Sequence, residues 1–121
     1  MINDMGMFLV LRISFVDCSI AVIIKVEEDA KEEHKSSAGR YERSNDFNGK
    51  PTYEMDNQKI LFGGNHWSIG RLENGIHYGL INAFDEFGGL TDPKNVWKYW
   101  DRNAYGETAI NINANCASGT S

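Results

Sequence analysis

The sequence predicts an all-β domain with at most one short helix, in which an antiparallel meander forms a small sandwich or barrel. Two hairpin signals carry this prediction, Asn48-Gly49 and Asn74-Gly75, because both central residues of the favoured two-residue turn need a positive φ. Further reversals are expected at 56–57 (Asp-Asn) and 63–65 (Gly-Gly-Asn). The runs between these turns are rich in strand-forming residues, so we expect roughly seven or eight short strands.

The turn at Asn74-Gly75 fixes the register of its hairpin, since a two-residue loop sets the residues on either side of it opposite one another. Counted back without interruption, this register pairs Trp67 with Asn82, Ile69 with Leu80, Arg71 with Tyr78 and Gly70 with Gly79. The glycine pair predicts a bare spot that another layer or a ligand can approach closely. The first hairpin needs a bulge or a longer loop between residues 44 and 49, because strict pairing leaves Tyr41 on a polar face.

Length and charge limit the classes of function. A chain of 121 residues has room for one domain. Its formal net charge of −5 argues against binding to a phosphate backbone, and we expect no nucleic-acid partner. The sequence contains neither a Cys-x-x-Cys pair nor the twelve-residue pattern of a calcium loop. We therefore expect no metal ion and no cofactor.

The most apolar stretch, residues 5–26, fits two interpretations. It can be a degenerate secretory signal with a small-x-small cleavage site at 19–21, although no Lys or Arg precedes it. It can instead hold a strand over 19–26, and we favour this interpretation because of the period-two alternation of Ile20, Val22, Ile24 and Val26.

Charged residues interrupt the apolar stretch and argue against a membrane span. We divide the chain into an N-terminal apolar segment (1–18), a single β-rich domain (19–116) and a disordered tail (117–121). Residues 27–38 are a charge run without an apolar stripe, which indicates a solvated loop or a frayed helical turn with an exposed His34.

The two cysteines, Cys18 and Cys116, either pair or remain as buried free thiols. A bond between them would join the first core strand to the last and stabilise the fold by about 4–5 kcal/mol in the chain-entropy model.

The C-terminal third combines one ambiguous segment and one clear strand. Asp92 followed by Pro93 is typical of a helix start, so residues 93–99 form either a short helical turn or the beginning of a strand through Trp97. Residues 110–116 alternate apolar side chains with asparagines, which predicts a half-buried strand.

Several of these features together resemble a known small β-rich module. They are Gly39-x-Tyr41, Asn48-Gly49-Lys50-Pro51-x-Tyr53, Ile60-Leu61-Phe62, Trp67-Ser68-Ile69, Pro93, Trp97 and a terminal strand ending in Cys116. The module recurs, often in tandem, in extracellular proteins of animals and protists. The resemblance covers residues 20–116 and implies an extracellular or secreted protein with a structural or binding role; otherwise the protein would be cytoplasmic.

No catalytic pattern is evident in the sequence. The three histidines, His34, His66 and His77, are not part of a His-Glu-x-x-His motif, and Gly-x-Ser-x-Gly and phosphate-binding glycine loops do not occur. A paired-carboxylate site would need a cleft that a domain of this size rarely forms. We therefore expect no enzymatic activity.

The favoured function is a non-catalytic binding or adhesion module with a carbohydrate or protein ligand. Its candidate ligand-binding residues are Asn65, His66, Trp100 and Tyr105, which lie near predicted turns, where amphipathic rings and amides can meet a ligand. The alternative is a structural repeat unit that self-associates through strand edges, for which residues 110–116 would serve. A small hydrolase is a third interpretation. The residues expected to serve the fold are Asn48, Gly49, Pro51, Trp67, Asn74, Gly75 and Trp97.

Overall fold

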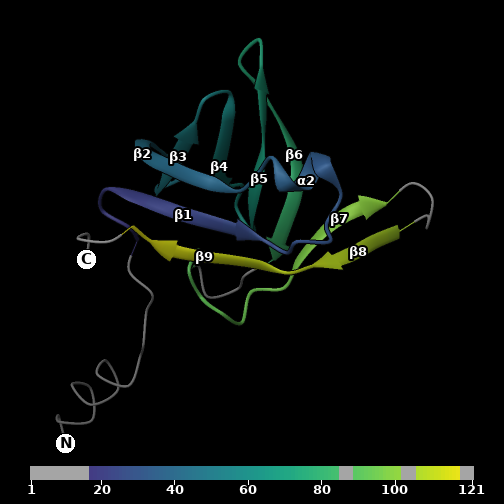
Figure 1. Cartoon of the computed structure of the whole chain (residues 1–121). Helices are drawn as coiled ribbons and strands as arrows, with labels where there is room; N and C mark the ends of the chain where they lie inside the picture. The colour runs from purple at the N-terminus through teal and green to yellow at the C-terminus, as the bar shows by residue number, and fades with distance from the viewer. Residues whose placement is uncertain (1–16, 85–88, 102–105, 118–121) are drawn as a thin grey trace, which may run out of the picture.

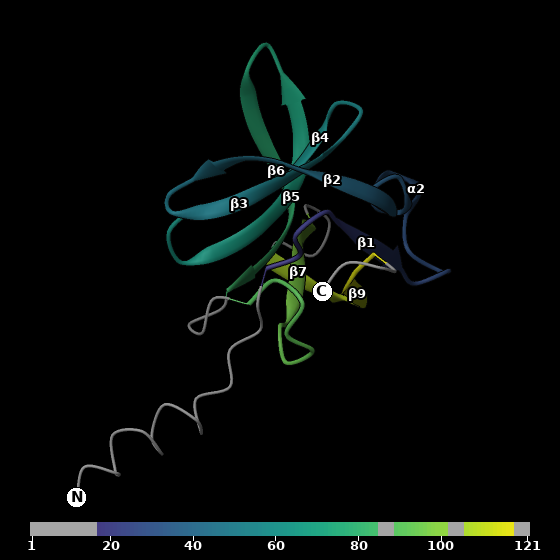
Figure 2. The same cartoon turned by 90° about the vertical axis from the view of Figure 1, so that its left-hand side faces the viewer.

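The computed structural model describes residues 17–84, 89–101 and 106–117, and it confirms the all-β prediction (Figure 1). Nine strands form one antiparallel sheet in the order β8-β7-β6-β5-β4-β3-β2-β1-β9. The sheet curls into a nearly closed barrel (Figure 2). The elements are β1 (Ala21–Val26), α2 (Glu32–Lys35), β2 (Gly39–Phe47), β3 (Lys50–Met55), β4 (Gln58–Phe62), β5 (His66–Glu73), β6 (Ile76–Phe84), β7 (Trp97–Asp101), β8 (Gly106–Ile110) and β9 (Ile112–Cys116). No helix within the described ranges is long and apolar enough to cross a membrane.

Both Asn-Gly hairpins form as predicted. The φ angles are 55° and 76° at Asn48 and Gly49, and 53° and 79° at Asn74 and Gly75. These positive values are those of the two-residue turn that matches the twist of the flanking strands, β2 with β3 and β5 with β6. The other two reversals also form, between β3 and β4 and between β4 and β5.

The β5–β6 hairpin contains a β-bulge that the uninterrupted count did not predict. The pairs Arg71–Tyr78 and Gly70–Gly79 form as expected, whereas the pairs beyond them are Ile69–Ile81, Ser68–Asn82 and Trp67–Ala83. The predicted pairs Trp67–Asn82 and Ile69–Leu80 are therefore wrong. Because Leu80 is an extra residue on β6, the fully buried Ile81 and Ala83 lie on the core face of the strand.

The space beside the glycine pair next to this bulge is occupied by other atoms of the same hairpin. A Cβ on Gly70 would lie 2.0 Å from the carbonyl oxygen of Tyr78, and a Cβ on Gly79 would lie 2.3 Å from Oγ of Ser68. Neither glycine leaves a bare spot for another layer or a ligand, so that expectation is wrong.

The irregularity predicted in the first hairpin is confirmed. Pro51 lies opposite Asp46, and the register then shifts before Arg43 pairs with Tyr53. Within this bulge the hydroxyl of Thr52 donates to the carbonyl oxygen of Asn45 at 2.6 Å. The shift places Tyr41 in the core, fully buried, instead of on the polar face.

The terminal strand closes the barrel by changing its partner. β8 and β9 form one run of chain that bends at Asn111, where β8 ends its pairing with β7 and β9 begins its pairing with β1 (Figure 1). Glu27 holds the bend, because its backbone N–H donates to the carbonyl oxygen of Asn111 and its side-chain Oε1 accepts from the N–H of Asn111 at 2.7 Å. This bend gives nine strands where roughly seven or eight were expected.

The core surrounds Trp67, which is fully buried and lies edge-on to Phe62, with a distance of 5.1 Å between the ring centroids. Trp97 is also buried, as expected for a residue that serves the fold.

The two ends of the domain are tied together. Cys18 and Cys116 form a disulfide with a Cα–Cα distance of 5.2 Å, which settles the open question of their pairing. Ala117, assigned to the tail by the sequence, is buried and donates its N–H to the carbonyl oxygen of Ala21. Residues 118–121, the rest of that tail, lie outside the described residues.

The charge run, residues 27–38, packs against the barrel at one end, and we call this segment the plug. Its helical turn, α2, buries His34, which is 4% exposed and stacks on Tyr99 at a centroid distance of 4.1 Å. The expectation of an exposed His34 is therefore wrong. The side chain of Tyr41 donates to the carbonyl oxygen of Ser37, and that of Gln58 donates to the carbonyl oxygen of Ser36, so the plug is bonded to the barrel wall.

Candidate functional site

The segment before β7 leaves the sheet where a longer strand would continue. Trp97 pairs with Ile110, so the antiparallel register extended outward would set Asn95 opposite Ile112 and Pro93 opposite Ala114. These pairs do not form. Pro93 has no N–H to give to a ladder, and the chain around it turns away from β9.

The turn that replaces this strand satisfies its own backbone groups. The N–H of Lys94 donates to Oδ1 of Asp92 at 2.8 Å, and the N–H of Asn95 donates to the carbonyl oxygen of Asp92 at 3.0 Å. Nδ2 of Asn95 donates to the carbonyl oxygens of Gly89 and Leu90. Asp92 therefore caps a turn as the sequence suggested, but the chain continues into β7 without forming a helix.

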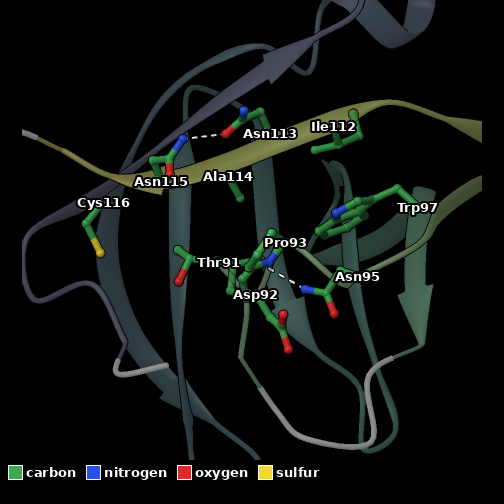
Figure 3. A pocket seen from close by; sticks show the side chains of 11 residues that line it. Thr91, Asp92, Pro93, Asn95, Trp97, Ile112, Asn113, Ala114, Asn115 and Cys116 are labelled. Carbon is green, nitrogen blue, oxygen red and sulfur yellow. Dashed lines mark hydrogen bonds between the residues drawn. The ribbon is translucent and has the colours of Figure 1, made fainter. Parts of the chain in front are cut away.

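A pocket of about 560 Å³ lies between this loop and β9. Figure 3 shows β9 along one side, with Trp97 toward one end of the strand and Cys116 toward the other. Pro93 lies across the pocket from β9, and the carboxylate of Asp92 lies beyond it, pointing away from the strand. The lining residues are Leu90, Thr91, Asp92, Pro93, Asn95, Trp97 and Ile112 to Cys116. The volume lies within the range of pockets that hold small ligands or short segments of chain.

β9 presents to this pocket an edge with which no described strand pairs, called the free edge below. The bonds from Glu27 N to Asn111 O and from Ala117 N to Ala21 O mark hydrogen-bonded pairs with β1. Because such pairs alternate along an antiparallel ladder, Asn113 and Asn115 also bond to β1. The N–H and C=O groups of Ile112, Ala114 and Cys116 therefore point the other way, and no described strand pairs with them.

The side chains of β9 alternate in the same way. Ala114 is buried and faces the core, whereas Asn113 and Asn115 are exposed and hydrogen-bonded to each other, with Nδ2 of Asn115 donating to Oδ1 of Asn113 (Figure 3). Figure 3 accordingly shows the side chain of Ala114 directed toward Thr91 and Pro93, and the asparagine pair directed to the other side of the strand.

Asp92 gives the pocket its charge. It is the one ionisable side chain among the lining residues and is 6% exposed. Its single hydrogen bond to a described residue is the one from Lys94 N, and no described Lys, Arg or His forms an ion pair with it. A carboxylate that is withdrawn from water without a cation favours a ligand that brings a hydrogen-bond donor or a positive charge.

The sequence-predicted binding residues lie elsewhere and are not brought together. Asn65 ends the turn before β5 and His66 is the first residue of β5; Nδ1 of His66 lies 2.8 Å from Oδ1 of Asn65. Trp100 lies on β7 and is 60% exposed. The turn is level with the Trp97 end of β7, because His66 pairs with residue 84, whereas Trp100 lies toward the opposite end of that strand. Tyr105 lies outside the described residues, and ligand binding by these residues stays a prediction.

The histidines give the pocket no acid–base group. His34 lies in the plug, and Nε2 of His77 contacts the carbonyl oxygen of Lys59 at 2.8 Å. Burial lowers the pKa of both imidazoles, which favours their neutral forms. None of the three histidines lines the pocket, and within the described ranges no three His, Cys, Asp or Glu side chains gather as a metal site requires.

Comparisons with protein-family models, with curated proteins and with solved structures find no significant match to this chain. The expected resemblance to a recurrent extracellular module therefore stays a prediction.

Sequence reasoning missed the pocket because it depends on two segments that are distant in the chain. Asp92 and Pro93 were interpreted as a helix start, residues 93–99 as a helical turn or the beginning of a strand, and the strand over 110–116 was judged by its alternation alone. The signal that the sequence did offer was Pro93, because a proline disfavours a regular strand in the segment that would otherwise pair with residues 110–116.

Proposed function

We propose that the protein is a secreted, non-catalytic binding module whose ligand, a carbohydrate or a segment of another protein, occupies the pocket beside β9. The observation that carries the proposal is the combination of an open strand edge with the charged side chain of Asp92 in one cavity. Hydrogen-bonding groups that converge on a concave surface are what a binding site requires.

The disulfide supports the extracellular part of the proposal. Bonds of this kind persist in oxidising environments and are rare in the reducing cytosol. The bond between Cys18 and Cys116 joins the first strand to the last, so the oxidised form is the one in which the barrel ends are held together.

A survey of ligands tests the proposal. The oxidised protein is applied to a glycan array and to an array of immobilised peptides, together with two variants. Asp92→Asn keeps an oxygen that can accept from Lys94 N and so preserves the turn, while it removes the charge from the pocket. Trp100→Ala removes the exposed ring on β7 without touching the pocket.

Binding that is lost in Asp92→Asn and kept in Trp100→Ala would support the pocket. The reverse pattern would place the ligand at Trp100, one of the binding residues predicted from the sequence, and would contradict the pocket as the site.

The structural repeat unit is retained as a second candidate because β9 has a free edge, which another copy could pair with. Light scattering across a hundredfold range of concentration tests it. A mass that rises with concentration favours assembly, and a constant monomer mass rules out this role.

A further inference from the structure

The free edge of β9 suggests the chemical class of the ligand more closely than the pocket volume does. The gap between β9 and the 89–96 loop lies where an antiparallel continuation of β7 would run. On this side of β9 the backbone N–H and C=O groups of Ile112, Ala114 and Cys116 point away from β1, and they are spaced as a strand requires. A saccharide could use a few of these groups, whereas an extended peptide could use all of them.

The charge of the pocket narrows the class further. Asp92 is almost fully buried, forms no ion pair with a described residue and belongs to a chain of net charge −5. A peptide that brings a Lys or Arg side chain would pair with this carboxylate, while an acidic peptide would be repelled by it.

We propose that the pocket binds an extended, basic peptide segment of another protein, which adds to the barrel as an antiparallel strand along β9 and extends a long Lys or Arg side chain across the pocket toward Asp92. The proposal rests on the binding function proposed above and specifies its ligand. Main-chain hydrogen bonds to the edge supply affinity, and the carboxylate supplies selectivity. The loop at 89–96 keeps its own hydrogen bonds and forms the opposite wall of the site.

A selection followed by amide exchange tests the proposal. A display library of random peptides of roughly nine residues, the length of an ordinary strand, is selected on the intact oxidised protein and counter-selected on Asp92→Asn. The enriched peptides are expected to carry Lys or Arg and to lack central proline. The best peptide is then synthesised in its original form and with N-methyl groups at alternate residues, which remove its donors to β9.

The expected result is specific to individual amides. In the free protein we expect the amides of Asn113 and Asn115 to be protected by their bonds to β1, and those of Ile112, Ala114 and Cys116 to exchange with water. The peptide should slow exchange of the second group at least about tenfold and leave the first group unchanged as an internal control. Asp92→Asn should weaken binding by about tenfold or more. N-methylation should abolish binding when it falls on the alternate residues whose N–H groups face β9, and should be tolerated on the other set.

Several outcomes would overturn the proposal. A library without enriched peptides, or a bound peptide that leaves the three edge amides unprotected, contradicts strand addition. Protection of those amides in the free protein at every concentration would mean that another part of the same chain covers the edge, and protection that grows with protein concentration would mean that a second copy covers it. A saccharide that binds in an Asp92-dependent way where no peptide does would refute the peptide and leave the binding function standing. Loss of dependence on Asp92 for every ligand would refute both.

Discussion

The backbone of Gly70 packs so closely against β6 that an added Cβ would lie 2.0 Å from the carbonyl oxygen of Tyr78 and 2.7 Å from Cα of Gly79. Both contacts are with backbone, which cannot move aside as a flexible side chain can. We expect Gly70→Ala to lower the free energy of unfolding by about 2–3 kcal/mol. Urea denaturation measures this loss.

Gly63→Ala is the matched control for this substitution. A Cβ at Gly63 meets only the imidazole of His66, at 3.3 Å, and that residue lies at an exposed turn. Its expected effect is within about 0.5 kcal/mol. Equal losses in the two variants would mean that the bulge in β6 relaxes around a side chain.

The buried imidazole of His34 makes stability depend on pH. Desolvation lowers its pKa below the unfolded value of about 6.5, against the opposing charges of Glu33 and Asp101 and together with that of Lys31. Between the two pKa values the unfolded chain binds more protons than the folded one. The contribution of His34 is therefore complete above about pH 6.5 and is lost as the pH falls through the lower, folded pKa.

Proton NMR of the imidazole checks the direction of this shift, and urea unfolding at about pH 7.5 and pH 5 checks its effect on stability. His34→Phe keeps a ring against Tyr99 and should reduce the pH dependence. Part of the dependence should remain, because burial also lowers the pKa of His77. A His34 that titrates at or above 6.5 in the folded protein would show that the plug is open to water.

Among the elements, the bend between β8 and β9 depends on a single acidic side chain. Oε1 of Glu27 accepts from the N–H of Asn111 at 2.7 Å, which satisfies the donor that is left between two partner strands. We expect Glu27→Ala to cost about 1 kcal/mol and to speed hydrogen exchange of the Asn111 amide. Glu27→Gln keeps an acceptor and should restore most of the protection. Glu28→Ala, at a neighbouring exposed position, should change neither quantity.

The two Asn-Gly hairpin turns could be predicted from local sequence, whereas the bend at Asn111 could not. The hairpin turns could be predicted because the φ angles that Asn48-Gly49 and Asn74-Gly75 adopt are preferences of those residues themselves. The bend at Asn111 could not, because its partner Glu27 is 84 positions away and either residue alone is ordinary. The extra residue Leu80 was missed for a related reason, since the burial of Ile81 and Ala83 outweighs the register set by the turn.

The candidate site was less predictable than the fold for the same physical reason. Alternation in residues 110–116 identified the strand but not which of its edges would lack a neighbour. That edge is free because the chain before β7 turns away at Asp92-Pro93, a local feature whose consequence depends on the register between β7 and β8.

For the whole molecule, the disulfide acts on the ends of the sheet rather than on a local turn. Cys18 and Cys116 are separated by 98 positions, and the bond joins the segment just before β1 to the last residue of β9. Closing so long a loop restricts the unfolded chain strongly, so the Cys18→Ser, Cys116→Ser double variant should lose about 4–5 kcal/mol of stability in urea. Total stabilities of such domains are of the order of 5–15 kcal/mol, so a parent near the low end of this range would leave the variant only marginally folded.

The native pairing of β1 with β9 provides the control for this loss. The bonds between Ala117 N and Ala21 O and between Glu27 N and Asn111 O do not depend on sulfur. In the double variant the amides of Asn113 and Asn115 should therefore stay more protected than the edge amides, although global unfolding becomes easier. If the variant were as stable as the parent, the disulfide would add no stability beyond that which the pairing of β1 with β9 already supplies. If the protection pattern itself disappeared, β9 would depend on the disulfide for its place in the sheet, and reduction alone would then dismantle the proposed binding edge.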